Sequence, residues 1–164
     1  MKAALDSIPN IHIDPLFKSL RAWLDDHSPT SVAVVTDPMT EKWCLPALNP
    51  HLPPGTQFLR LGQHGEKIKS IEHTHALWDS FEGMGMDRHG LVIALGGGTI
   101  TDLTAFASST YLRGVHFWLI PTTLLSMVDA SIGGKTGINF RGLKNRIGTF
   151  AQPSGVSIHS SFLD

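Results

Sequence analysis

The sequence predicts an open α/β fold, in which helices cover both faces of a mostly parallel sheet. Short apolar runs recur along the chain, and they are continuous rather than alternating, which is typical of strands buried on both faces. Segments with apolar residues at helical spacing separate these runs, so strand and helix alternate. With 164 residues, 41% of them hydrophobic, the chain has the size of one domain with its own core.

The chain begins with a predicted helix over about residues 14–26. Asp14 supplies an N-cap there, and Pro15 supplies a proline at the first helical position. Residues 32–35 form a short apolar run that predicts a buried strand. Asp37-Pro38 follows directly and is typical of a helix start. Residues 57–61 indicate another strand.

The next helix is indicated by apolar residues at helical spacing between residues 68 and 81, and glycines at 83 and 85 end it. Residues 91–95 form a third apolar strand, which runs into Gly96-Gly97-Gly98. A further helix follows, and residues 115–120 form the next strand, closed by Pro121. In such folds the ligand sits at the carboxyl ends of the strands.

Charged residues are sparse and unevenly distributed. They make up 16% of the chain, where about 25% is usual, and residues 91–164 hold eight of the 27 charges but ten of the 16 glycines. With a net charge of −1 and no dense basic run, we expect neither a nucleic acid nor a membrane surface as partner. No apolar stretch reaches the roughly 20 residues of a membrane span, so we expect a soluble, cytoplasmic protein.

The glycine run is the first candidate for chemistry. A buried strand ends in three residues without Cβ atoms and passes into a helix, so backbone N–H groups and the helix dipole can face a pyrophosphate. The run is not the G-x-G-x-x-G pattern, and a tight turn would explain it equally well. Asp102 lies in the first helical turn, where an acid is also favoured as a helix-dipole partner.

Polar residues follow the next strand. Thr122 and Thr123 point two hydroxyls towards the same crevice, although capping of the following helix would explain at least one of them. Asp129 and Lys135 flank Gly133-Gly134 in a segment almost without other charges, so we expect them to converge. Arg113 is similarly isolated, and a guanidinium suits bidentate binding of phosphate or carboxylate.

A series of motifs in the second half of the chain identifies a family. In sequence order they are Gly96-Gly97-Gly98-x-x-x-Asp102, Thr110-Tyr111-Leu112-Arg113-Gly114, Pro121-Thr122-Thr123-Leu124-Leu125, Val128-Asp129-Ala130-Ser131-Ile132-Gly133-Gly134-Lys135-Thr136, Lys144-Asn145-x-Ile147-Gly148 and Gln152-Pro153. Their order and spacing resemble those of 3-dehydroquinate synthases, most densely over residues 91–153. The resemblance implies a Rossmann-like NAD-binding N-terminal domain over residues 1–164.

The resemblance also implies an activity. Enzymes of this family convert a seven-carbon keto-acid phosphate (DAHP) into 3-dehydroquinate in the shikimate pathway. NAD oxidises one hydroxyl transiently, phosphate is eliminated, the ketone is reduced again, and an aldol addition closes the ring. A homodimer is implied as well.

Site residues carry over from the resemblance by position. The implied NAD-binding residues are Asp37, Glu66, Lys69, Gly97, Gly98, Thr99, Asp102, Thr122, Thr123, Lys135 and Lys144. The implied catalytic, substrate-side residues are Arg113, Asp129, Lys135, Lys144 and Asn145. Their types suit a doubly anionic polyol, with cations for phosphate and carboxylate, and Asp129 and Asn145 for hydroxyls.

Some features depart from the family pattern. The family usually has glycine where Thr101 and Leu143 stand, and aspartate where His159 stands. Its proteins are roughly twice this long, and a helical C-terminal domain absent from this chain supplies a Glu and two His for a divalent metal, zinc or cobalt. We therefore expect no metal site within this chain and no activity of the chain alone.

Other functions remain open at this point. A related sugar-phosphate cyclase would share nearly all of these motifs. An NAD- and metal-dependent alcohol or glycerol dehydrogenase would share the glycine run and the Pro-Thr-Thr sequence, though not residues 128–135. A nucleotide-binding module without chemistry is the alternative from another class.

Overall fold

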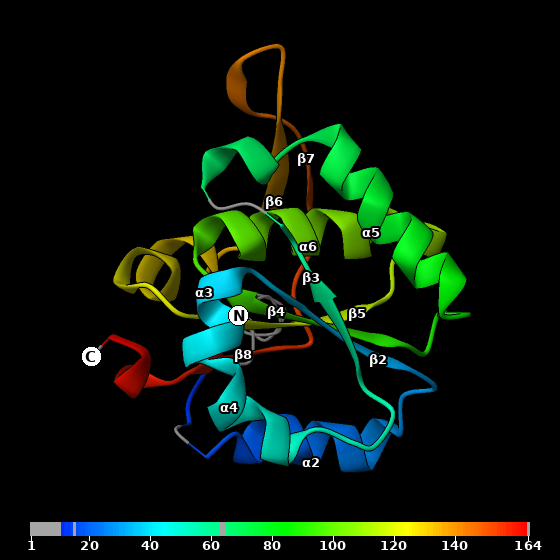
Figure 1. The fold of residues 1–164 in the computed structure, drawn as a ribbon, viewed down its shortest axis with the longest axis vertical. Helices are drawn as coiled ribbons and strands as arrows, with labels where there is room; N and C mark the ends of the chain where they lie inside the picture. Colours follow the sequence, from blue (N-terminus) through cyan, green and yellow to red (C-terminus); the bar gives the residue numbers. More distant parts are fainter. Residues whose placement is uncertain (1–10, 15, 63–64, 164) are drawn as a thin grey trace, which may run out of the picture.

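The computed structural model describes residues 11–14, 16–62 and 65–163. Its main sheet has six strands in the order β1-β8-β5-β4-β2-β3, and every neighbouring pair is parallel (Figure 1). These strands are β1 (Ile11–Ile13), β2 (Val32–Thr36), β3 (Gln57–Arg60), β4 (Leu91–Gly96), β5 (His116–Pro121) and β8 (Gly155–Ile158). The predicted open α/β fold with a mostly parallel sheet is confirmed.

Helices cover both faces of this sheet, with α2 and α4 on one side and α5 and α6 on the other (Figure 1). The helices are α2 (Lys18–His27), α3 (Pro38–Trp43), α4 (Leu45–Leu48), α5 (Ile71–Gly83) and α6 (Gly98–Thr110). Alternate residues of one strand serve the two cores: Val34 packs with the α2 side, and Val35 with the α6 side. Burial on both faces explains why the central strands are continuously apolar.

The path of the chain creates a crevice between β2 and β4. From β2 the chain moves to β3 at the edge, and from β4 it moves to β5 on the opposite side. Neighbouring strands whose connections diverge in this way leave an opening at their carboxyl ends, where ligands bind in open α/β sheets. Thr36 and Gly96 end the two strands at this opening.

A two-stranded antiparallel hairpin stands outside the main sheet, above α6 in Figure 1, and consists of β6 (Lys135–Phe140) and β7 (Leu143–Phe150). Three hydroxyls join its base to α6. The Thr149 hydroxyl lies 2.7 Å from Ser109 Oγ and 2.6 Å from Thr136 Oγ1. Ile138 is fully buried in the core on the α6 side. The hydroxyl contacts attach the base of the hairpin to α6, and Ile138 anchors β6 in the core.

The first helix begins later than predicted, at Lys18 rather than near residue 14. The Asp14 carboxylate does accept hydrogen bonds from the backbone N–H groups of Leu16 and Ser19, but Phe17 has a left-handed φ of 49° and separates this turn from the helix. Pro15, expected at the first helical position, lies outside the described residues. The short helical turns are η1 (Asn49–His51), η2 (Glu66–Ile68), η3 (Tyr111–Arg113), η4 (Ser126–Ala130) and η5 (Ser160–Leu163).

The other predicted elements form within two residues of their expected bounds, except that α5 begins at Ile71, three residues after Ile68, which lies in η2. In contrast, β1, β8 and the hairpin were not predicted. Among the described residues, no helix combines the length and apolar character needed to cross a membrane.

Candidate functional site

A cavity of about 330 Å³ lies at the carboxyl ends of β2, β4 and β5. We call it the nucleotide cavity. Its wall is formed by Asp37, Met39, Thr40, Gly65, Ile68, Gly97, Gly98, Thr99, Ile100, Thr122 and Thr123. Six of the predicted cofactor-binding residues meet here: Asp37, Gly97, Gly98, Thr99, Thr122 and Thr123.

The glycine run gives this cavity a wall of backbone. Among the described residues, no side chain caps α6, which begins at Gly98 directly after Gly97. The first N–H groups of this 13-residue helix are therefore without an intrahelical partner and suit a ligand. Gly97 also packs closely, since a Cβ atom there would lie 3.2 Å from Thr123 Cγ2. Both features favour a close approach of phosphate to backbone.

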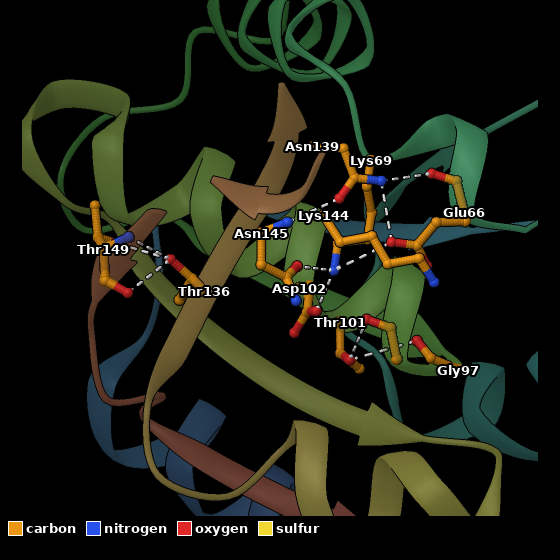
Figure 2. A network of polar contacts seen from close by, with 11 residues as sticks. Glu66, Lys69, Gly97, Thr101, Asp102, Thr136, Asn139, Lys144, Asn145 and Thr149 are labelled. Carbon is orange, nitrogen blue, oxygen red and sulfur yellow. Dashed lines mark hydrogen bonds and ion pairs between the residues drawn. The ribbon is translucent and has the colours of Figure 1, made fainter. Parts of the chain in front are cut away.

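Thr101 does not obstruct this wall, although the family usually has glycine there. Its side chain is buried, and its hydroxyl donates to the backbone oxygen of Gly98 at 3.0 Å (Figure 2). A threonine can satisfy its hydroxyl in this way inside a helix. The departure from the family pattern therefore leaves the nucleotide cavity open.

Two residues of the nucleotide cavity also organise the local backbone. Oδ1 of Asp37 accepts hydrogen bonds from the N–H groups of Met39 and Thr40, both at 2.9 Å, and so caps α3. The hydroxyl of Thr123 lies 2.9 Å from Ser126 Oγ at the turn that leads into η4. Capping thus accounts for part of what each side chain does, as anticipated for the threonines.

A second cavity, of about 500 Å³, lies between α6, η4 and the hairpin. We call it the hairpin cavity. Its charged and amide-bearing residues are Asp102, Asp129, Lys135 and Asn145, and Ile132, Gly148 and Phe150 are among its other walls. Asp129 and Lys135, expected to converge because they flank a glycine pair, do line the same cavity. Asp102 belongs to this cavity rather than to the nucleotide cavity.

Lys69 connects α6 to the hairpin through hydrogen bonds to Asp102 and Asn145. Its side chain is only 4% exposed, and its Nζ atom donates to Asp102 Oδ2 at 2.6 Å and to Asn145 Oδ1 at 2.5 Å (Figure 2). Burial raises the pKa of Asp102, and the hydrogen bond and charge of Lys69 oppose that rise. Lys69 therefore lies in a buried ion pair.

Glu66, Lys144 and Arg113 lie outside both cavities. Glu66 and Lys69 border a separate cavity near the tip of the hairpin, and Lys144 is 72% exposed, with its Nζ 3.9 Å from Glu66 Oε2. Arg113 is exposed in η3, before β5 begins, and so lies at the amino ends of the strands. The structure of this chain does not bring Arg113 to the other predicted residues.

Asn139 was not among the predicted site residues. Its Nδ2 donates to Glu66 Oε1 at 3.0 Å, and its Oδ1 accepts from the backbone N–H of Asn145 at 3.0 Å (Figure 2). The available signal was a lone amide side chain following the apolar Ile138 in a segment already rich in motifs.

The divalent metal implied by the resemblance would need several convergent ligands. Within the described residues, no group of three or more His, Cys, Asp or Glu side chains could hold a metal ion. His159, where the family usually has aspartate, stacks on Phe162 with ring centroids 4.5 Å apart and lies 2.7 Å from Ser161 Oγ. His159 is therefore a buried histidine that packs against an aromatic neighbour.

A family model described as 3-dehydroquinate synthase N-terminal matches residues 61–164. This range includes every residue of the hairpin cavity, and all residues of the nucleotide cavity except Asp37, Met39 and Thr40. The chain belongs to this 3-dehydroquinate synthase family. Its motif-based assignment is thereby confirmed.

Individual relatives agree with the family match. A 3-dehydroquinate synthase of Pyrococcus abyssi is 44% identical over 154 residues, which are 94% of this chain and 46% of that protein. One of Enterococcus faecalis is 43% identical over 138 residues, which are 82% of this chain and 38% of that protein. The chain thus spans about half the length of these 3-dehydroquinate synthases.

Solved structures show the same fold. The 2-epi-5-epi-valiolone synthase of Streptomyces hygroscopicus, with NAD+ and Zn2+ bound, has a TM-score of 0.78 at 31% identity, over 94% of this chain and 43% of that chain. A 2-deoxy-scyllo-inosose synthase has a TM-score of 0.79 over the same shares of the two chains, at 21% identity.

Proposed function

We propose that this chain binds NAD in the nucleotide cavity, as the nucleotide-binding part of a 3-dehydroquinate synthase. One observation carries the proposal: the uncapped start of α6, with Gly97 and Gly98, faces a cavity at the strand ends where the sheet's connections diverge. Backbone N–H groups at such a helix start suit a pyrophosphate. The NAD+ bound to the similar valiolone synthase supports this choice of ligand.

Different residues of the nucleotide cavity would bind different parts of NAD. The N–H groups of Gly97, Gly98 and Thr99, which line this cavity, would hold the pyrophosphate. The hydroxyls of Thr122 and Thr123 would lie beside it, and Asp37, which follows β2, would hold a ribose. NAD, when bound, supplies a hydride acceptor for the oxidation of an alcohol. Glu66, Lys69 and Lys144 stay predictions as cofactor contacts.

The hairpin cavity is the proposed place of the substrate. Lys135 supplies a cation for a carboxylate or phosphate, and Asp129 and Asn145 supply groups that bind hydroxyls. DAHP carries all three kinds of group. The family match and the relatives named 3-dehydroquinate synthase support DAHP over other sugar phosphates.

The isolated chain is expected to bind its cofactor without catalysing the reaction. Because it spans about half the length of its relatives, we propose that it binds NAD without converting DAHP, and that the metal ligands, a second domain and a homodimer contact belong to the complete enzyme. Arg113 is included here only as a predicted substrate contact.

Calorimetric titration of the chain with NAD+ tests the assignment. The parent should bind, and Gly97→Val, which places a branched side chain against Thr123, should weaken binding about tenfold or more, a loss of roughly 1.4 kcal/mol. Gly83→Ala is the matched control, because a Cβ there meets no atom within 4 Å. Absence of NAD+ binding by the parent contradicts the proposal, and phosphate release from DAHP by the chain alone contradicts its second part.

A further inference from the structure

The contact with Lys69 fixes the orientation of the Asn145 amide in the wall of the hairpin cavity. The Lys69 ammonium carries three donors and no acceptor. The amide atom of Asn145 that faces it at 2.5 Å must therefore be Oδ1, which leaves Nδ2 on the other side of the amide. Among the described residues, no group accepts a hydrogen bond from Asn145 Nδ2. Asn145 consequently offers a donor to the cavity that it lines.

The same reasoning fixes Asn139. The Glu66 carboxylate is an acceptor, so Asn139 presents Nδ2 to it, and the backbone N–H of Asn145 is a donor, so Asn139 presents Oδ1 there. This second contact also stabilises an unusual backbone, since Asn145 has a left-handed φ of 52°. Asn139 therefore holds the backbone of Asn145, and Lys69 holds its side chain.

Asp102 completes the arrangement. Its Oδ2 is occupied by Lys69 at 2.6 Å, and within the described part of the chain no donor reaches Oδ1. Asp102 and Asn145 line the same cavity, and both are bound to one ammonium group. An acceptor and a donor thus stand side by side, a pattern that matches a hydroxyl group, which donates one hydrogen bond and accepts others.

We propose that Lys69 and Asn139 are positioning residues, which present Asp102 as acceptor and Asn145 as donor to a single hydroxyl group of a polyol ligand. Lys69 does not line the hairpin cavity itself, so it acts through these two side chains. The identity of the ligand as DAHP rests on the proposed function. The positioning of Asn145 does not, and it can be measured on the chain without ligand.

Nuclear magnetic resonance of the isotope-labelled chain measures the positioning directly. In the parent, the Lys69 ammonium should give a signal protected from exchange with water. Asn145→Ala should make this ammonium exchange about tenfold faster, as expected for the loss of one hydrogen bond to a charged group. Asn139→Ala should accelerate exchange of the Asn145 backbone amide by a similar factor. Both residues lie on the hairpin, so we expect these variants to keep the main sheet and its cores.

The role of Lys69 is tested by comparing Lys69→Met with Lys67→Met. Lys69→Met should remove the protected signal and shift the Nδ2 signals of Asn145, whereas Lys67→Met, an exposed lysine on the same turn, should change neither. An unchanged ammonium exchange rate in Asn145→Ala, or an unchanged Asn145 amide in Asn139→Ala, overturns the positioning proposal.

A titration with DAHP at saturating NAD+ tests the ligand. Lys69→Met should weaken DAHP binding about tenfold, and Lys67→Met, which removes the same charge, should leave it unchanged. Equal losses in both variants indicate long-range charge and overturn the hydroxyl assignment. A parent that does not bind DAHP refutes the proposed substrate, while the exchange measurements on the ligand-free chain still decide the roles of Lys69 and Asn139.

Discussion

The Nζ atom of Lys69 lies 2.6 Å from Oδ2 of Asp102, and the two residues are 33 positions apart in the sequence. The lysine comes just after η2, and the aspartate from the first turns of α6. With 4% exposure for Lys69 and 19% for Asp102, this ion pair is largely removed from water. Loss of the lysine leaves the Asp102 carboxylate without its charged partner, whereas the Lys69 ammonium also lies 3.9 Å from Glu66 Oε1.

Lys69→Met should therefore lower the free energy of unfolding by about 2–3 kcal/mol, because the Asp102 carboxylate loses its charged partner. Urea denaturation followed by circular dichroism measures the change. Lys67→Met should change the stability by less than about 0.5 kcal/mol, as is usual for exposed sites. Equal effects of the two substitutions would show that the ion pair does not stabilise the fold.

The pKa of Asp102 predicts how stability depends on pH. Burial, with Glu66 and Asp129 in support, raises this pKa above the ordinary 3.8, and Lys69 opposes the rise. The folded state then binds the proton more tightly than the unfolded state, so this group's contribution is fully present below 3.8 and is lost as pH rises through the folded pKa.

Asp102→Asn removes that titration. Relative to the variant, the parent should lose stability as pH rises from about 3 to about 7. Urea denaturation of both proteins at several pH values gives the difference. A difference in stability that does not change with pH, or that changes in the opposite direction, contradicts the raised pKa.

Cys44 should react slowly with thiol reagents. Burial, followed by the charge of Asp37, raises the pKa of its thiol from 9.0 to about 11. The thiolate is the reactive form, so two pH units correspond to about 100-fold less of it. Labelling with Ellman's reagent at mildly alkaline pH should be slower by about this factor in the native chain than in the urea-unfolded chain. Equal labelling rates in the native and the unfolded chain would show that burial does not protect the Cys44 thiol.

Gly148 should be necessary for the hairpin. A Cβ atom at this position would overlap the backbone oxygen of Thr136 on the facing strand. We expect Gly148→Ala to destabilise the chain by about 2 kcal/mol or more, through displacement of β7. Gly83→Ala is the control, because its Cβ has open space and alanine favours a helix. Thermal unfolding compares them, and similar melting temperatures would show that the hairpin can adapt.

Local patterns were sufficient to predict the elements that build the nucleotide cavity. Continuous apolar runs mark β2, β4 and β5 because these strands are buried on both faces, and Asp37-Pro38 marks a helix start because capping is a local interaction. The hairpin escaped prediction because β7 is exposed along nearly all of its length and lacks an apolar signature.

The polar network was harder to predict for a different reason. Family resemblance pointed to Lys69 and Asp102 separately, each as a contact to the cofactor. Their pairing depends on η2 and α6 being brought together by the sheet's crossover connection, which no local pattern records. Asn139 escaped because its importance arises from contacts with Glu66 and Asn145, on either side of it in space.

The start of α6, together with the preceding Gly97, forms part of both cavities, since Gly97–Thr99 line one and Asp102 lines the other. For protein engineering, this shared wall makes it harder to alter one cavity without altering the other. We expect substitutions in this stretch to affect the nucleotide cavity and the hairpin cavity together. We expect independent tuning where the walls are separate, for example in the β2–α3 turn around Asp37 for the nucleotide cavity and in the hairpin for the hairpin cavity.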